Sequence, residues 1–265
     1  MRFRSIASGS NGNCIYTGTD RTHILIDAGI SCKRIEGGLN ELGLSGDGLS
    51  AVLVTHEHID HVAGLKVLSK RTGVPIYGTP GTIGAILASD KDGVIDPSLC
   101  IRISPEEDFV IGDYTVRAIR TSHDAAEPCA YRLSSGGKTV AVVTDLGTYN
   151  EAQVSALQEL NGILLEANHD IRMLETGHYP YPLKRRILSD FGHLSNERSG
   201  SLLDRILNPH MAFALLGHLS EENNYPELAL LSVKSEIDFS DSEWKSDDFR
   251  IETACRYESS GIFEI

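Results

Sequence analysis

The segment from Thr55 to His61 reads T-H-E-H-I-D-H and places three imidazoles and two carboxylates within six residues. It directly follows the apolar run 51–54. Imidazole and carboxylate are the ligands that zinc, manganese and iron accept in proteins. His56 and His58 can both turn toward one ion, whereas Asp60 and His61 would serve a neighbouring position. A motif of this density favours a metal site over a solvated polar turn.

Two further apolar runs end in residues of the same chemical types. The run 116–121 is followed by His123, and the run 140–144 is followed by Asp145. Loops at strand ends are where layered α/β proteins place their chemistry. Taken alone, either residue would be an ordinary loop residue. Together with the first motif, they supply ligands that a site for two metal ions would otherwise lack.

The elements that must position these residues alternate between short strands and helices. Periodicity and turn residues predict strands over 3–7, 13–17, 23–27, 51–55, 75–78, 99–103, 113–121, 130–134, 138–144, 162–166, 211–217 and 249–257. Helices are predicted over 32–42, 62–72, 82–88, 151–160, 197–207 and 226–235. No strong linker interrupts this pattern. We therefore expect a layered α/β protein that forms one domain over residues 1–265, with the segment 221–265 completing the fold.

Length and composition limit the class of protein. The chain has 265 residues, of which 41% are hydrophobic and 23% charged, and this excludes a disordered or collagen-like chain. No apolar run approaches the ~20 residues of a membrane helix, and the first residues lack the apolar stretch of a secretory signal. The five cysteines include no C-x-x-C pair, which favours a reducing compartment. We expect a cytoplasmic protein that does not associate with membranes.

Charge is distributed unevenly along the chain. The formal net charge is −13, and the segment 221–265 alone holds 12 acidic and 4 basic residues. Lys184, Arg185 and Arg186 form a local basic cluster. Because net charge governs solubility and long-range steering, it does not exclude a polyanionic substrate at one face.

Longer stretches of the sequence resemble a known superfamily. The motif T-H-E-H-I-D-H, with L-I-D-A-G before it and T-D-L-G after it, resembles the metallo-β-lactamase superfamily. The segments S-G-S-N-G-N-C, E-A-N-H-D, G-H-L-S-N-E and L-G-H-L-S-E-E-N-N are similar to the YycJ/WalJ family, a nuclease-like branch. The resemblance runs from about Ser5 to Pro226. It implies an αββα sandwich that binds two divalent metal ions, zinc or manganese or iron.

The resemblance also implies a role for each site residue. His56, His58 and His123 would hold the first ion, and Asp60, His61 and a late histidine would hold the second, with Asp145 bridging. Asp60 is thereby also implied in catalysis, and Asp27 is implied to orient a ligand histidine. Glu166, Asn168 and His169 follow another apolar run, but nothing assigns them a chemical role.

The late histidine has two candidates, because His193 and His218 both lie in G-H-L-S. His218 follows the apolar run 211–217, as the other expected ligands follow theirs. His193 instead precedes a predicted helix. By resemblance to phosphodiesterases of the superfamily, we expect His218 to bind metal and His193 to protonate the leaving group.

The activity implied by the resemblance is that of a 5′-to-3′ DNA exonuclease, in which two metal ions activate a hydroxide. Two other functions fit the same residues: a hydrolase of a small thioester, lactone or cyclic phosphodiester, and a metal-binding regulatory protein without turnover. Salt dependence distinguishes the exonuclease from the small-substrate hydrolase, since contacts to the phosphates of a nucleic acid weaken as ionic strength rises.

Contacts to a nucleic acid, preferably DNA, are expected from small donors and cations. These are Ser10, Asn13, Lys184, Arg185 and Arg186. The alternative for Ser10 and Asn13 is a simple tight turn, and the alternative for the basic cluster is a solvated face. Tyr179 and Tyr181 have faces on which an unpaired base can stack, although packing is the favoured interpretation. The sequence does not set the oligomeric state.

Overall fold

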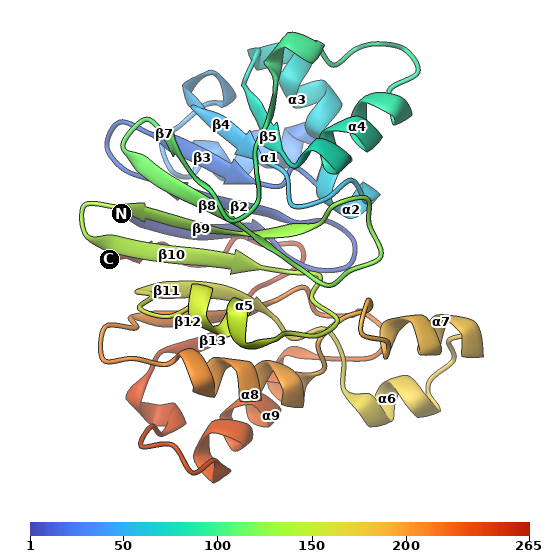
Figure 1. Cartoon of the computed structure of the whole chain (residues 1–265), viewed down its shortest axis with the longest axis vertical. Helices are drawn as coiled ribbons and strands as arrows, with labels where there is room; N and C mark the ends of the chain where they lie inside the picture. The colour runs from blue at the N-terminus through green and yellow to red at the C-terminus, as the bar shows by residue number, and fades with distance from the viewer. The chain divides into compact units, whose positions relative to one another are not determined.

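The computed structural model describes residues 1–265, which divide into two compact units. Unit 1 comprises Met1–Arg120, Ala125–Gly137 and Cys255–Glu264, and unit 2 comprises Thr121–Asp124, Lys138–Ala254 and Ile265. Figure 1 labels their helices and strands. No helix combines the length and the apolar character that crossing a membrane requires.

Unit 1 is built on a seven-stranded sheet with the strand order β14-β1-β2-β3-β4-β5-β6. Strands β3 to β6 run parallel, and their side chains form near-continuous apolar runs. Ile24, Leu25 and Val52 in this half are fully buried. The strands are β1 (Arg2–Ala7), β2 (Cys14–Gly18), β3 (His23–Ile26), β4 (Ala51–Leu53), β5 (Ile76–Gly78), β6 (Cys100–Arg102) and β14 (Phe263–Glu264).

Helices cover one face of this sheet. Leu25 and Val52 from the strands share a core with Ile35 and Leu39 of α1 and Leu68 of α3. Truncating such a buried leucine to alanine costs about 2–5 kcal/mol, so this core fixes the strand ends firmly. The helices are α1 (Cys32–Asn40), α2 (Ile59–Val62), α3 (Leu65–Thr72) and α4 (Pro80–Ser89).

The helix predicted over 62–72 begins later, as α3 over Leu65–Thr72, and a separate short helix, α2, ends at Val62. The chain turns at Gly64, whose backbone N–H donates to the Ala28 carbonyl at 2.8 Å. A side chain at Gly64 would collide with the Ile30 carbonyl, so only glycine permits this approach. The break lets α2 carry part of the histidine motif on a separate short helix.

Three antiparallel strands of unit 1 face the other side of this sheet. Thr17 Oγ1 lies 3.1 Å from the Tyr114 hydroxyl, and the Tyr131 hydroxyl donates to the Val54 carbonyl at 2.9 Å. The strands are β7 (Asp108–Ile111), β8 (Tyr114–Arg120) and β9 (Cys129–Ser135). Strand β7 was not predicted, because its acidic start hides the short apolar alternation that pairs with β8.

Unit 2 is built on four parallel strands in the order β13-β12-β11-β10. Its long helices α8 and α9 pack on each other and contact β11 and β13, respectively (Figure 1). The strands are β10 (Lys138–Val143), β11 (Gly162–Glu166), β12 (Phe213–Gly217) and β13 (Ile251–Thr253), so the strand predicted over 249–257 is shorter than expected. The helices are α5 (Glu151–Ala156), α6 (Ile171–Thr176), α7 (Tyr181–Ile187), α8 (Asn196–Ile206) and α9 (Pro226–Phe239).

Candidate functional site

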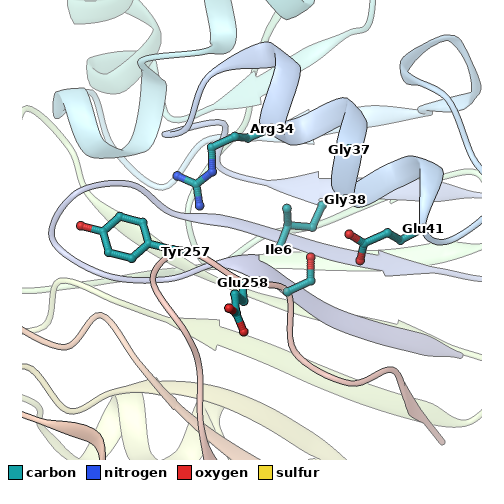
Figure 2. A pocket seen from close by; sticks show the side chains of 8 residues that line it. Ile6, Arg34, Gly37, Gly38, Glu41, Tyr257 and Glu258 are labelled. Atoms are coloured by element: carbon teal, nitrogen blue, oxygen red, sulfur yellow. The ribbon is translucent and has the colours of Figure 1, made fainter.

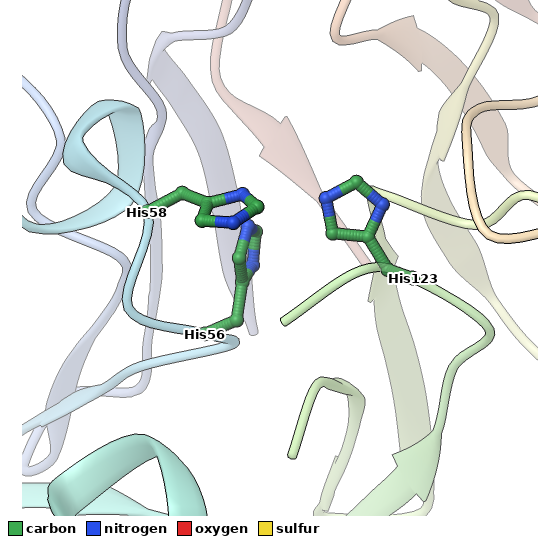
Figure 3. A group of neighbouring side chains, drawn as sticks. All are labelled: His56, His58 and His123. Carbon is green, nitrogen blue, oxygen red and sulfur yellow. The ribbon is translucent and has the colours of Figure 1, made fainter. Parts of the chain in front are cut away.

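The histidine motif of unit 1 occupies the loop after β4 and the start of α2. His56 and His61 are buried, and their ring centroids are 4.1 Å apart. The His56 ring lies 4.6 Å from that of His58, edge to face, and Figure 3 shows this pair. Asp60 Oδ2 is 3.4 Å from His61 Nε2. Four donor groups of the types that bind zinc or manganese thus gather at one strand end.

Asp27 holds His61 in place, as the resemblance implied. Its Oδ2 accepts a hydrogen bond from His61 Nδ1 at 2.7 Å, and its carboxylate also accepts from the backbone N–H and the hydroxyl of Thr55. Burial raises the pKa of Asp27, while His61 and Thr55 oppose that rise. With Nδ1 of His61 so engaged, Nε2 is the nitrogen that can coordinate a cation.

The loop at the start of the chain supports this motif. The Asn13 backbone N–H donates to the Asp60 carbonyl at 2.8 Å, and the Asn13 side chain accepts from the Gly9 N–H at 3.1 Å. Asn13 is fully buried, and its Nδ2 lies 3.3 Å from His61 Nε2. Ser10, by contrast, is exposed. The buried side chain of Asn13 therefore anchors the loop, and Ser10 is the expected substrate contact that faces solvent.

A shallow cavity of about 420 Å³ in unit 1 lies between α1 and the residues after β13 (Figure 2). Arg34 from α1 donates to the Arg256 carbonyl at 3.0 Å and lies over the Tyr257 ring. Glu41 and Glu258 line the same cavity. None of the expected site residues lines this cavity.

In unit 2, Asp145 stands among three imidazoles. Its Oδ1 is 3.5 Å from His123 Nε2, 3.5 Å from His193 Nδ1 and 3.8 Å from His218 Nδ1. The four residues come from four separate loops, and Figure 3 shows His123 on the loop after β8. One carboxylate shared by several imidazoles is the arrangement expected of a ligand to a metal ion.

The backbone is strained where three residues of the candidate site leave their strands. Asp27 after β3, Asp145 after β10 and His218 after β12 have φ values of 62°, 55° and 54°. Non-glycine residues seldom adopt this left-handed conformation, and it costs on the order of 1–3 kcal/mol at each position. The surrounding fold imposes the conformation, which is typical of functional sites.

Glu166, the last residue of β11, joins the two late histidines. Its Oε1 accepts from Nδ1 of His193 and Nδ1 of His218, both at 2.8 Å, and Oε2 accepts from the Leu146 and Leu194 backbone N–H groups. Burial would raise the pKa of Glu166, but the two imidazoles and their hydrogen bonds lower it to about 2. The ionised carboxylate therefore fixes both rings with Nε2 as the reactive nitrogen.

His193 and His218 differ in exposure. The side chain of His193 is 14% exposed, whereas that of His218 is 1% exposed. The Asn168 side chain donates to the His218 carbonyl at 2.9 Å and holds its backbone. A buried, immobilised imidazole suits a ligand, and one that reaches solvent suits proton transfer.

His123 is oriented by a backbone carbonyl. Because the Gly192 carbonyl can only accept, the 3.0 Å contact makes His123 Nδ1 the donor and leaves Nε2 with the lone pair. Burial lowers the pKa of His123, so its imidazole is neutral, as metal binding requires. Three of the expected ligands are held by an oxygen atom at Nδ1: His61 by the Asp27 carboxylate, His123 by the Gly192 carbonyl and His218 by the Glu166 carboxylate.

The basic cluster on α7 is not uniform. Lys184 Nζ donates to the Glu175 and Gly177 carbonyls, each at 2.7 Å, and Arg186 forms a bidentate ion pair with Asp124. Arg185 is exposed and makes neither kind of contact. Within the cluster, Lys184 and Arg186 hold α7 in place, and Arg185 presents its charge to solvent.

Two residues of this site were assigned no chemistry from the sequence. Glu166 binds two histidines, and Asn168 holds the His218 backbone. The available signal was a glutamate at the end of a fully buried strand, since an unpaired buried carboxylate is rare. The partners of Glu166 lie 27 and 52 positions away in the chain, so local spacing does not reveal them.

Known proteins match the chain along most of its length. A β-lactamase superfamily domain matches residues 22–212. The chain is 36% identical to exodeoxyribonuclease YycJ of Bacillus anthracis over 238 residues, which cover 90% of this chain and 89% of that protein. It is also 36% identical to exodeoxyribonuclease WalJ of Streptococcus pneumoniae D39, with 89% and 88% covered.

Solved structures support the fold. The metallo-β-lactamase fold protein YhfI of Bacillus subtilis superimposes with a TM-score of 0.71 at 17% identity, covering 100% of this chain and 99% of that one. Zn²⁺-bound PqqB of Methylobacterium extorquens gives a TM-score of 0.67 at 17% identity, with 100% of each chain covered. The expected αββα sandwich of the metallo-β-lactamase fold is confirmed.

Proposed function

Because the chain belongs to the metallo-β-lactamase superfamily and, within it, to the YycJ/WalJ family, we propose that this metal-dependent hydrolase is a 5′-to-3′ DNA exonuclease. The observation that carries the proposal is Glu166, whose one carboxylate orients His193 and His218 together. That pairing links a proton donor to a metal ligand.

Two divalent ions are assigned to the expected ligands. His56, His58 and His123 would hold the first ion, Asp60, His61 and His218 would hold the second, and Asp145 would be a ligand shared by both. The donor set of imidazole and carboxylate without thiolate fits zinc, manganese or iron. The Nδ1 contacts of three ligand histidines fit this assignment as well.

When bound, two such ions supply a nucleophile at neutral pH and offset the charge on the phosphate oxygens. The protein's own groups complete the hydrolysis. The oxygen of a water molecule becomes bonded to phosphorus, one proton of that water passes to solvent, and the bond from phosphorus to the leaving oxygen breaks. His193 gives the leaving oxygen its proton from Nε2, while Glu166 holds the ring in place through Nδ1.

DNA is the proposed substrate because both curated relatives are named exodeoxyribonucleases and match the chain over most of its length. Arg185 and Ser10 are the proposed phosphate contacts that face solvent, with Asn13, Lys184 and Arg186 supporting them. A DNA substrate and free thiols at all five cysteines fit a cytoplasmic location.

The test is the product pattern on end-labelled, 5′-phosphorylated double-stranded DNA and matched RNA, with manganese and with zinc. Stepwise release of nucleotides from the 5′ end of DNA, absent in Asp60→Ala, is the expected result. If the metal-loaded protein degrades neither polymer but hydrolyses bis(p-nitrophenyl) phosphate, the substrate is a small ester and the nuclease proposal is wrong.

A further inference from the structure

An exposed stripe of aromatic, apolar and basic side chains leads along α7 toward His193. Tyr181 is 72% exposed, Leu188 42% and Phe191 60%, and Arg185 is exposed as well. Tyr181, Arg185 and Leu188 are spaced by four and then three residues, so they share one face of the helix. Figure 1 shows α7 and α6 at one side of unit 2, apart from α8 and α9. The packing role expected for Tyr181 therefore does not apply.

The end of this stripe is held rigidly beside the catalytic histidine. Phe191 lies two residues before His193 in a turn that several contacts fix. The Gly192 N–H donates to the Ser189 carbonyl at 2.9 Å, and the His193 N–H donates to the Ile187 carbonyl at 3.1 Å. The exposed ring of Phe191 is therefore presented from a turn whose backbone is held by hydrogen bonds.

Neighbouring loops of unit 2 brace the same turn. The Ser122 hydroxyl donates to the Asp190 carbonyl at 2.7 Å, and His123 donates to the Gly192 carbonyl at 3.0 Å. Gly147 approaches the Asp190 carbonyl so closely that a Cβ would collide with it. The expected metal ligand His123 and the Phe191 turn are therefore connected by a direct hydrogen bond.

We infer that the stripe of Tyr181, Arg185, Leu188 and Phe191 binds an unpaired strand of the DNA substrate, with Phe191 stacked on the base at the leaving-group side of the scissile phosphate. The inference rests on the proposed function. It identifies the substrate end as single-stranded, since a base must leave its duplex partner to stack on a side chain.

Chemistry along the stripe favours a nucleic acid as its occupant. Aromatic faces stack on bases of any sequence, and an intervening cation contacts the backbone phosphate. Arg185 has no carboxylate partner, whereas the charge of Arg186 is already matched by Asp124. The position of Phe191 beside the proton donor fixes which base it meets, because His193 must reach the leaving oxygen.

Kinetics on matched DNA substrates test the inference. One oligonucleotide has an intact unpaired 5′ nucleotide, and the other has an abasic residue at that position. Full-length wild type is compared with Phe191→Ala, Phe191→Trp, Arg185→Ala and Phe239→Ala. Phe239 is 89% exposed at the end of α9 and controls for removal of an exposed phenylalanine.

Phe191→Ala should lower kcat/KM on the intact DNA by about tenfold or more, mainly through KM, since stacking on one side chain is typically of that size. Phe191→Trp should restore it, and the abasic substrate should not distinguish Phe191→Ala from wild type. Arg185→Ala should weaken the binding of both substrates and reduce the salt dependence of kcat/KM. Phe239→Ala should match wild type.

Equal kinetics of Phe191→Ala and Phe239→Ala on DNA that the wild type cleaves would overturn the inference and leave the proposed function intact. Equal losses on intact and abasic substrates would overturn it also, because the base would not be recognised. A change of oligomeric state in Phe191→Ala with unchanged kinetics would assign the stripe to a second copy instead. Absence of DNA cleavage by wild type is the separate failure of the proposed function.

Discussion

Oε1 of Glu166 lies 2.8 Å from Nδ1 of His193, and the Glu166 carboxylate is fully buried. The same oxygen holds His218 at 2.8 Å. One carboxylate therefore sets the orientation of the proposed proton donor and of a proposed metal ligand. Any change at Glu166 must act on both histidines.

Replacing Glu166 by glutamine should lower both metal occupancy and rate. The amide has one acceptor oxygen, so its NH₂ group must face two donors. These are the Leu146 and Leu194 N–H groups if the oxygen keeps both histidines, or the two ring Nδ1 atoms if it does not. We expect a loss of about 10- to 100-fold in metal affinity, as for other groups that orient ligands. Excess metal should restore occupancy, measured by elemental analysis, but not the turnover of DNA. Full recovery of turnover would show that Glu166 does not act through His193.

The roles of His193 and His218 separate in alanine variants. His218→Ala should lose one metal ion because it removes a proposed ligand. His193→Ala should retain both ions and lose about 10²- to 10⁴-fold in rate, the usual contribution of general acid catalysis. Metal content and single-turnover rates measure the two effects, and His178→Ala, an exposed histidine on the loop before α7, is the control. Loss of metal in His193→Ala, with metal retained in His218→Ala, would show that the two assignments must be exchanged.

Asp27→Asn should weaken metal binding without changing the ligand set. Asparagine preserves an acceptor for Thr55 but loses the charge that holds His61 Nδ1 at 2.7 Å. We expect about 10- to 100-fold weaker binding of one ion, with the other ion unaffected. Competition with a coloured chelator measures both affinities. Unchanged affinities would show that backbone packing alone orients His61.

Stability should fall with decreasing pH through His169. This residue is 1% exposed, its Nδ1 has no hydrogen-bond partner, and burial lowers its pKa to about 4. The unfolded chain, with a pKa of 6.5, takes up the proton first as the pH falls. The contribution is therefore complete above pH 6.5 and is progressively lost toward pH 4, by about 2 kcal/mol at pH 5.

The variant His169→Gln cannot titrate in this range and isolates that effect. Its stability in urea should depend less on pH than that of wild type between pH 7 and 5. The comparison is of slopes, so a constant loss of stability in the variant does not matter. Parallel curves for the two proteins would mean that His169 stays neutral in both states.

The sequence predicted the strand ends well, because several of the expected ligands lie just after a buried apolar strand. His56 follows β4, Asp145 follows β10 and His218 follows β12 after short connections. Helix α7 was not predicted. Pro180 and Pro182 read locally as breaks, yet both stand in or before its first turn, where proline is tolerated.

Burial and long-range contacts were harder to predict. Asn13 was expected to contact a nucleic acid, but it is buried and contacts Asp60, which is 47 positions away. The basic cluster suggested three equivalent cations, but Arg186 meets Asp124 from another loop. Such pairings arise from the topology of the fold, and local sequence patterns do not encode them.

The most direct test of the account is to titrate metal-free protein with manganese while measuring bound metal and nucleotide release from the 5′ end of DNA in the same sample. The account predicts that release appears with two ions per chain and is lost in Asp60→Ala, which should bind fewer. DNA degradation that persists in excess chelator, or that Asp60→Ala retains in full, would contradict it.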